Sequence, residues 1–344
     1  MILRELSEAI GVSGDEGAVR TIIKTAIDGH VDEVWVDNLG NLLAIKRGTG
    51  SVPLRVMLDA HMDEVGMMIT GLNADGSLSF HPVGGLDPRV VLGKTVWVGP
   101  KRLVGVVGGK PIHLCTAKER SRVVPMDSLR IDIGAADEKE ASGKVKVGDR
   151  ATFATEYRDL GATLMGKAFD DRAGCAVMVE LLRGERYPMD VAAAFTVQEE
   201  VGLRGAGVAA YRLEPDVALA LEGTICDDLP REPDEDISPV TEVGKGPAIS
   251  LMDRATIADP RLVRFLAETA ELNHIPYQFR RTSAGGTDAG AIHLSRGGVP
   301  SVGLSVACRY IHSPVALCSR EDIENMIRLL QAALSSLTPA VIAR

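Results

Sequence analysis

Three uninterrupted apolar stretches constrain the fold of this 344-residue chain most strongly. They are VAAAFTV at 191–197, VALAL at 217–221 and SVGLSV at 301–306. A continuous apolar stretch of this kind is typical of a strand that is buried on both faces. Segments with helical spacing, such as residues 171–183, lie between these stretches. The pattern therefore predicts an α/β fold, with a parallel or mixed sheet flanked by helices.

Two further helices are marked by the residues that precede them. Asp259 followed by Pro260 is a typical N-cap with proline in the first turn. Ser319 with Asp322 three residues later has the spacing of a capping box. The helix after Ser319 is expected to pack on the sheet, because it carries apolar residues at helical spacing, namely Ile323, Met326, Ile327, Leu330 and Leu334.

The helical spacing disappears between about residues 67 and 160. Short β-rich pieces such as GSLSF, RLVGVVG and SLRIDIG take its place, separated by turns with Gly, Pro or Asp. This texture predicts a small barrel-like β domain. We therefore expect one α/β domain made of residues 1–66 and 161–344, interrupted by an inserted β domain at 67–160.

The insert also carries apolar residues that we expect on its surface, namely Val90, Val91, Leu92, Val96 and Trp97. Small β domains leave edges and apolar faces that partner subunits can cover. Almost none of the polar motifs of the chain lie in this segment. Its expected role is therefore contact between subunits rather than catalysis.

The charge and the cysteines exclude several classes of function. A formal net charge of −9 offers no attractive field to nucleic acids or anionic membranes, so neither is expected as a partner. No stretch approaches twenty apolar residues, and MILRELSEAIG predicts an amphipathic helix rather than a signal peptide or membrane span. The five cysteines include no CxxC pair, which favours reduced thiols and a cytoplasmic protein.

Acidic and imidazole side chains stand at the ends of the predicted strands. Because the carboxyl ends of parallel strands meet at one edge of a sheet, we expect these groups to lie close together. A single pair, such as the one in AHMDEVG, has a simpler explanation as a polar strand end that contacts water. Several strands with such groups favour bound cations, because buried carboxylates repel one another unless they are neutralised. The residues concerned are His61, Asp63, Asp170, Glu199, Glu200, Glu222 and His312.

Two histidines and several carboxylates, without cysteine ligands, suit divalent zinc, cobalt or manganese in a hydrolytic site. The set is larger than one catalytic ion needs, and two ions that share a carboxylate would use the surplus. Glu199 and Glu200 are adjacent in sequence and face opposite ways in an extended segment. One of them can therefore bind metal while the other takes the proton of a metal-bound water.

Seven motifs together resemble the tetrahedral aminopeptidase family, which also contains glutamyl aminopeptidases and members labelled as endoglucanases. They are AHMDEVG, KAFDDRAG, FTVQEEVGLRGA, ALEGTICDDLP, GKGPAI, TSAGGTDAGAIHLSRGGVPSVGL and RYIHSP. The resemblance implies a di-metal aminopeptidase that acts on short peptides, with zinc or cobalt as cofactor. It also implies an α/β catalytic domain and an inserted β domain, in dimers that assemble into a hollow dodecamer.

The resemblance also implies roles for individual residues. His61 and Glu222 would hold one metal ion, Glu200 and His312 the other, and Asp170 would bridge both. Many members have Asp where this chain has Glu222, and the longer side chain can change the geometry or the metal preference of its site.

The remaining roles concern proton transfer and the substrate. Glu199 would be the general base, and Asp63 would hydrogen-bond His61 and fix its tautomer. The peptide bond after Asp170 is cis in related two-metal peptidases. The Gly-rich turn before the last strand suggests substrate contact, with Gly286, Thr287 and Asp288 as the residues.

Two other functions are compatible with parts of this pattern. A glycoside hydrolase also uses two carboxylates, but usually in an aromatic-lined cleft, and the chain has only two Trp and five Tyr. A non-catalytic, metal-stabilised scaffold would need the ligands but not Glu199. The sequence leaves the preferred first residue of the substrate open, because it does not place Arg204, Arg254, Arg281 or Arg309.

Overall fold

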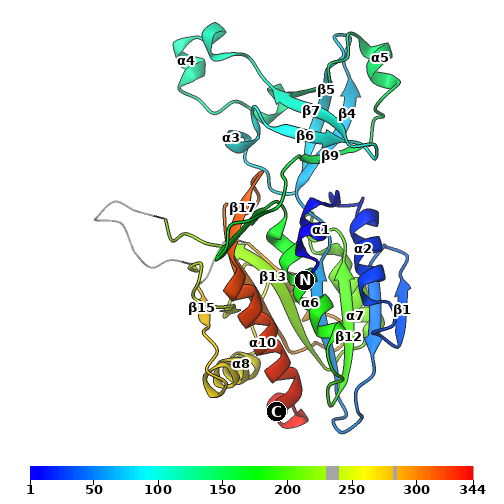
Figure 1. Cartoon of the computed structure of the whole chain (residues 1–344), viewed down its shortest axis with the longest axis vertical. Coiled ribbons are helices and arrows are strands. Elements are labelled where there is room, and N and C mark those ends of the chain that lie inside the picture. Colours follow the sequence, from blue (N-terminus) through cyan, green and yellow to red (C-terminus); the bar gives the residue numbers. More distant parts are fainter. Residues whose placement is uncertain (230–239, 282–284, 344) are drawn as a thin grey trace.

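The computed structural model describes residues 1–229, 240–281 and 285–343. A large mixed sheet with helices forms one end of the molecule, and a small closed barrel forms the other (Figure 1). The predicted α/β fold class with a barrel-like insert is confirmed. In the described parts of the chain, no helix is long and apolar enough to span a membrane.

The large sheet has eleven strands, of which nine follow the order β1-β2-β12-β3-β13-β16-β17-β11-β10, while β14 pairs with β15 and β16. The central strands β12, β3, β13 and β16 are parallel to their neighbours in this group, and antiparallel strands form both sides. The bounds are β1 Glu33–Val36, β2 Leu42–Lys46, β3 Arg55–His61, β10 Arg158–Asp159, β11 Thr163–Gly166, β12 Asp190–Thr196, β13 Val217–Ile225, β14 Ala248–Ser250, β15 Gln278–Arg280, β16 Ser301–Arg309 and β17 Ala316–Ser319.

Both faces of this sheet are covered by helices. The larger core includes side chains of α1 (Leu3–Glu8), α2 (Gly17–Ile27), α6 (Phe169–Arg183), α8 (Pro260–Leu272) and α10 (Arg320–Ser336). On the other face lie α7 (Arg204–Leu213) and α9 (Ala289–Ile292). The short α11 (Pro339–Ile342) packs on α8.

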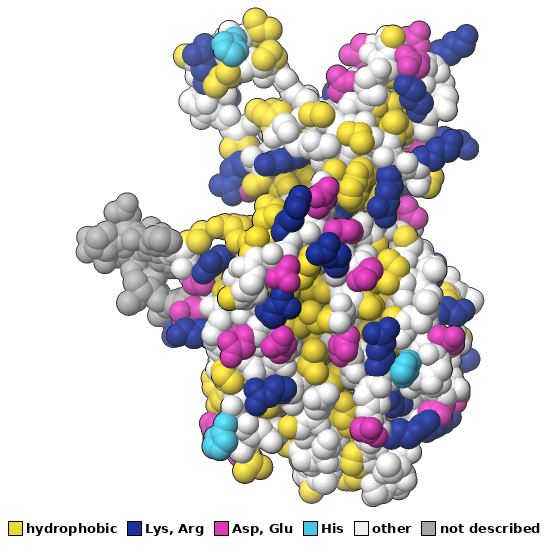
Figure 2. All heavy atoms as spheres, in the orientation of Figure 1, with side chains coloured by type: hydrophobic (Ala, Val, Ile, Leu, Met, Phe, Trp, Pro, Cys, Tyr) yellow, Lys and Arg dark blue, Asp and Glu magenta, His cyan; other side chains and the backbone are white. Residues whose placement is uncertain are grey.

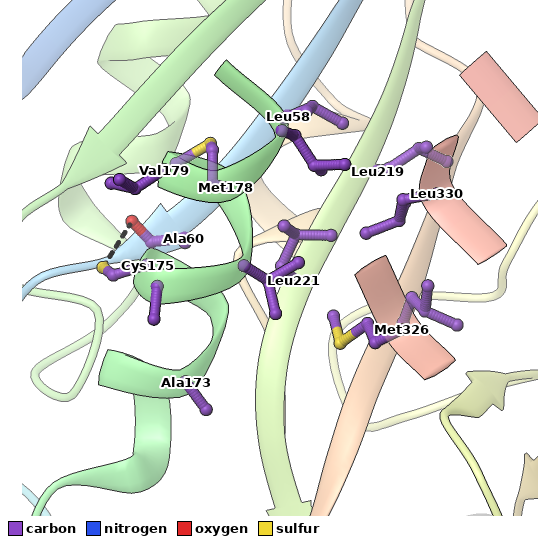
Figure 3. Close-up of a cluster of buried hydrophobic side chains, with 14 of the residues drawn as sticks. Leu58, Ala60, Ala173, Cys175, Met178, Val179, Leu219, Leu221, Met326 and Leu330 are labelled. Atoms are coloured by element: carbon purple, nitrogen blue, oxygen red, sulfur yellow. Dashed lines mark hydrogen bonds between the residues drawn. The ribbon is translucent and has the colours of Figure 1, made fainter. Parts of the chain in front are cut away.

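Alternation along the central strands explains the two cores. On β3, Leu58 belongs to the larger core and Met57 to the other, because successive side chains of a strand point to opposite faces. Figure 3 shows Leu58, Leu219 and Leu221 of the sheet beside residues of α6 and α10. Uninterrupted apolar strands are therefore what this sheet requires, as the sequence predicts.

The barrel closes in the order β4-β5-β8-β7-β6-β9. Its strands are β4 Gly66–Leu72, β5 Leu78–Val83, β6 Thr95–Val98, β7 Leu103–Gly108, β8 Arg130–Asp132 and β9 Arg150–Phe153. Short helical turns connect them, namely α3 Pro88–Val91, η1 Ile112–Leu114, α4 Ala117–Arg120, η2 Met126–Ser128 and α5 Glu138–Ser142. The barrel has its own buried core, in which Ile69, Leu78 and Ile131 are fully buried.

The predicted surface residues of the insert were partly wrong. Val91 and Val96 are fully buried in the barrel core, whereas Leu92 is exposed. Val91 ends the short helix α3 instead of continuing a strand, and this turn points it inward. Besides Leu92, the apolar residues that lie on the surface of the barrel are Val104, Val106, Ile112, Leu114, Val123 and Val147.

The predicted helix starts are confirmed, with one difference. Asp259 caps α8 by accepting a hydrogen bond from the Arg261 amide, and Ser319 caps α10 by accepting one from the Asp322 amide. The Asp322 carboxylate accepts hydrogen bonds from the Gly244 and Gly246 amides at 2.7 and 2.8 Å. It therefore anchors the loop before β14, which the predicted capping box did not foresee.

A buried ionic cluster joins the α/β part to the barrel. The Lys167 ammonium donates to both Glu64 oxygens at 2.7 Å, and both side chains are almost fully buried. The hydroxyl of Thr152, on barrel strand β9, donates to the same carboxylate at 2.8 Å. Arg172 contacts this carboxylate at 3.4 Å and donates to the Met62 carbonyl. Each buried charge thus has a charged or hydrogen-bonding partner, as burial requires.

Candidate active site

The carboxyl edge of the central strands gathers the acidic and imidazole residues identified in the sequence. His61 is the last residue of β3, Glu199 and Glu200 follow β12, and His312 follows β16. Asp170 stands at the start of α6, and the peptide bond between it and Asp171 is cis, as the resemblance implies. Glu222 lies within β13 and not after it, because this strand continues to Ile225.

These residues form two clusters that share Asp170. The His61 Nε2 atom lies 3.2 Å from Asp170 Oδ1 and 3.7 Å from Glu222 Oε2. The His312 Nε2 atom lies 3.3 Å from both Asp170 Oδ2 and Glu200 Oε1. Within each cluster, one ligand atom of every member lies within 4.8 Å of the others. The two carboxylate oxygens of Asp170 thus face different clusters.

Asp63 organises the loop that carries Glu199 and Glu200. Its Oδ1 atom accepts a hydrogen bond from the Glu199 amide at 3.0 Å, and its Oδ2 atom accepts from the Glu200 amide at 3.2 Å. The Ser13 hydroxyl donates to Oδ2 at 2.6 Å. The Nδ1 atom of His61 is nearer to the Asp63 carbonyl oxygen, at 3.1 Å, than to the carboxylate, at 3.5 Å.

The excess of acidic groups changes their proton affinities. Burial raises the pKa of Glu199 well above its usual value, and the carboxylates of Glu222, Asp288 and Glu200 add to this rise. Burial also raises the pKa of Glu200 to about 7, although His312 opposes the change. The pKa of His312 rises to about 9, because Asp170 and Glu200 outweigh the effect of burial. The clustered carboxylates therefore hold protons more tightly than usual, and they stabilise the positive charge of a protonated His312.

This donor set fits divalent cations. Two imidazole nitrogens and three carboxylates face one another in a partly buried position, and such groups are the ligands of zinc and related ions in hydrolytic sites. A cation in either cluster would offset the repulsion among the carboxylates, which adds to the effect of burial on the pKa values of Glu199 and Glu200. Asp170 presents one oxygen to each cluster, as a carboxylate shared by two ions would.

A cavity of about 760 Å³ opens beside the clusters. Four of the acidic residues line it, and so do two cationic residues, Arg254 and Arg280. Gly286 and Thr287, the predicted substrate contacts, are also among its lining residues.

Asp288 is fully buried and does not line the cavity. Its amide donates to Glu222 Oε1 at 3.1 Å, and its carboxylate accepts from the Thr196 hydroxyl at 2.7 Å. Asp288 therefore holds the Glu222 carboxylate in place from the buried side of the site. Arg309, another residue that the sequence could not place, pairs with Asp228 at 2.6 Å.

Sequence reasoning missed three contacts at this site: the Ser13 hydroxyl on Asp63, the Asp288 amide on Glu222, and a contact from the barrel, where the Gly85 carbonyl oxygen lies 3.2 Å from His312 Nδ1. Two of the three use backbone groups, which no side-chain pattern reveals. The Gly84-Gly85 pair in VGGLDPR was the only available signal for the third.

The profile of a family described as M42 glutamyl aminopeptidase matches residues 40–329. The chain belongs to the M42 family. A putative aminopeptidase of Acetivibrio thermocellus is 40% identical over 97% of each chain. The lysyl aminopeptidase of Pyrococcus furiosus is 34% identical, over 98% of this chain and 97% of the relative. The glutamyl aminopeptidase of Lactococcus lactis is 32% identical, over 99% and 97%. This M42 member is accordingly an aminopeptidase.

Solved structures of M42-like proteins agree with this assignment. A TET aminopeptidase from a marine sediment archaeon of the Thaumarchaeota superposes with a TM-score of 0.94 at 39% identity, covering 99% of this chain and 97% of the other. The Pyrococcus horikoshii TET1 peptidase is described as able to form a tetrahedron or an octahedral shell. It superposes with a TM-score of 0.86 at 35% identity, covering 97% of this chain and 98% of the other. A protein labelled endoglucanase from Thermotoga maritima gives 0.82 at 37%, with 99% and 98% covered. The resemblance to the tetrahedral aminopeptidases is confirmed.

Proposed function

We propose that this M42 protein is a di-metal aminopeptidase that removes first residues from short peptides. The observation that carries the proposal is the pair of clusters joined by Asp170 beside the cavity. His61, Asp170 and Glu222 would hold one divalent ion, and Asp170, Glu200 and His312 the other, with zinc or cobalt as candidates. When bound, such ions supply Lewis acidity toward a carbonyl oxygen and acidify a water molecule.

Glu199 would transfer the proton in this reaction. Its carboxylate lies 3.8 Å from His61 Nε2, at the edge of the first cluster, and Asp63 fixes its backbone. It would accept a proton from the attacking water and return it to the leaving amine. Burial raises the pKa of this carboxylate. A raised pKa suits both steps, because a group accepts and returns protons best when its pKa lies near the working pH.

The acidic wall of the cavity supports cleavage at the first peptide bond. A free α-amine is the cationic or hydrogen-bond-donating group that these carboxylates would hold, and an internal peptide bond has none. The test is a comparison of aminoacyl anilides with their N-acetylated forms. We expect hydrolysis of the free-amine substrates only, and equal rates on both would contradict an aminopeptidase.

The glycoside hydrolase alternative has less support. The described residues that line the cavity include no Trp, Tyr or Phe, and a sugar-binding cleft usually contains such rings. The endoglucanase label of the Thermotoga relative is therefore not extended to this chain. Release of reducing sugar from soluble cellulose by the purified protein would reopen that alternative, whereas the scaffold alternative predicts no hydrolysis of either substrate class.

We propose further that acidic first residues are preferred. The relatives are named after different first residues, glutamyl and lysyl, so their names do not indicate the preference of this chain. The proposal rests instead on its cavity, where Arg254 is a cationic lining residue. A charge-assisted hydrogen bond to a substrate carboxylate contributes about 1.5–3 kcal/mol. Arg254→Ala should therefore lower kcat/KM for a glutamyl anilide by about 10- to 100-fold, and leave the leucyl anilide nearly unchanged. Equal losses on both substrates would contradict a role in side-chain recognition.

We propose that the barrel mediates self-association, with a dodecamer as the end state. Seven apolar residues are exposed on it, and Figure 2 shows apolar side chains across the barrel and near its junction with the α/β part. Self-assembly of the P. horikoshii relative supports the proposal. Light scattering should give about twelve times the mass of one chain, and Val104→Lys should reduce it. A fully active monomer at micromolar concentration would remove this proposal alone.

A further inference from the structure

One turn of the barrel reaches the second of the two clusters. Gly84 and Gly85 lie between β5 and α3, outside the large sheet that carries the acidic and imidazole residues. The Gly85 carbonyl oxygen is 3.2 Å from Nδ1 of His312. Gly84 packs on the other member, because a Cβ built there would lie 3.3 Å from Glu200 Cβ and 3.4 Å from its Oε2. A single turn thus contacts both residues that complete the cluster with Asp170.

The contact with Gly85 determines which nitrogen of His312 carries the proton. A carbonyl oxygen can only accept a hydrogen bond, so the Nδ1 atom facing it must be the donor. The Nε2 atom of the neutral ring then keeps its lone pair, and this atom lies 3.3 Å from Asp170 and Glu200. That arrangement presents the ring correctly to a cation, since metal-binding histidines usually donate their other N–H to a carbonyl or carboxylate.

A side chain in this turn would press on its neighbours. A Cβ at Gly85 would lie 3.2 Å from His312 Nδ1, and a Cβ at Gly84 would lie 2.8 Å from Val65 Cγ1. Gly84 also has a φ of +77°, which other residues rarely adopt. Glycine at both positions therefore allows the backbone itself to approach the cluster.

We propose that the Gly84-Gly85 turn is a positioning element of the active site, which sets the Nδ1–H tautomer of His312 and holds it with Glu200 against Asp170. The inference rests on the proposed di-metal function. It assigns the barrel a part in catalysis through the arrangement of these two residues, in addition to any role in assembly.

A tautomer measurement tests the proposal without any substitution in the turn. In zinc-loaded protein labelled with ¹⁵N-histidine, we expect the proton of the His312 ring on Nδ1, with the resonance assigned from a His312→Gln variant. A proton on Nε2 would overturn the proposal. Wild-type protein that binds no zinc or cobalt would instead contradict the proposed function on which the inference rests.

A substitution tests the positioning directly. Gly85→Ala should weaken the binding of one of two cobalt ions by about 10- to 100-fold in calorimetry, as loss of a ligand-orienting contact does. The other ion should bind as in the wild type, and kcat should fall more than KM changes. The matched control is Gly108→Ala in barrel strand β7, where the nearest atom, the Arg130 carbonyl oxygen, is 3.9 Å from the new Cβ. Wild-type affinity for both ions and wild-type kcat in Gly85→Ala would refute the positioning role.

Discussion

Replacement of Glu199 by glutamine is expected to lower kcat by about 10²- to 10⁴-fold, the range that general bases contribute. The amide has nearly the same shape as the carboxylate but cannot accept and return a proton. Glu199 belongs to neither of the two clusters around Asp170, so both ions should remain bound. Its backbone amide donates to Asp63, and this contact does not depend on the side chain. Steady-state rates and elemental analysis of the same sample measure the two effects.

The neighbouring residue provides the control for this experiment. Glu200→Gln removes a carboxylate that faces His312 at 3.3 Å, so this variant should lose metal affinity together with activity. Loss of turnover with full metal content in Glu199→Gln, and loss of both in Glu200→Gln, would separate the proposed roles of the two glutamates. Full activity in Glu199→Gln would exclude it as the base.

Removal of the metal ions by a chelator is expected to abolish activity and to lower the melting temperature. An ion that binds only the folded state stabilises it by about 2.7 kcal/mol when present at 100 times its Kd, and two ions give about 5 kcal/mol. For a chain of this size, that corresponds to a fall in Tm of about 7 °C. Scanning calorimetry before chelation, after it, and after zinc or cobalt is added back measures the change. Unchanged melting with full activity would contradict both parts.

The stability of the chelated protein should also depend on pH. Because the pKa of Glu200 is raised to about 7 in the folded state, the protein gains stability from its protonation, which is lost as pH rises from its ordinary value of 4.5 through about 7. The pKa of His312, raised from 6.5 to about 9, acts in the same direction at higher pH. The Tm of the chelated form should therefore fall between pH 5 and 9 more steeply than that of the metal-loaded form.

The large sheet and the two clusters could be predicted because they depend on side-chain identity. Continuous apolar strands specify burial on both faces, and the rule that sites lie at the carboxyl ends of strands places His61, Glu200 and His312 together. The insertion was visible as a loss of helical spacing. These inferences need only which residues are apolar, acidic or imidazole, and in what order.

The features that the sequence did not reveal depend on the path of the backbone and on contacts made by backbone groups. Val91 and Val96 face the barrel core, because a short helix and a tight turn change which side chains point inward. The backbone amide of Asp288 donates a hydrogen bond to Glu222, and the backbone carbonyl oxygen of Gly85 contacts His312. Such contacts leave no side-chain signature. Arg254 could not be placed at the cavity from the sequence, because it lies in a loop whose path no regular residue spacing predicts.

The order of the strands in the sheet has a consequence for synthesis on the ribosome. Among the described strands, β3 pairs with β12 and β13 alone, and the whole barrel is translated between β3 and these partners. The barrel strands can therefore close while β3 still lacks both of its neighbours, although β1 and β2 can already pair with each other. At about 5–20 residues per second, roughly 10–50 s separate the emergence of His61 from that of His312. The nascent chain thus remains without an assembled hydrolytic centre until nearly all of it has been made.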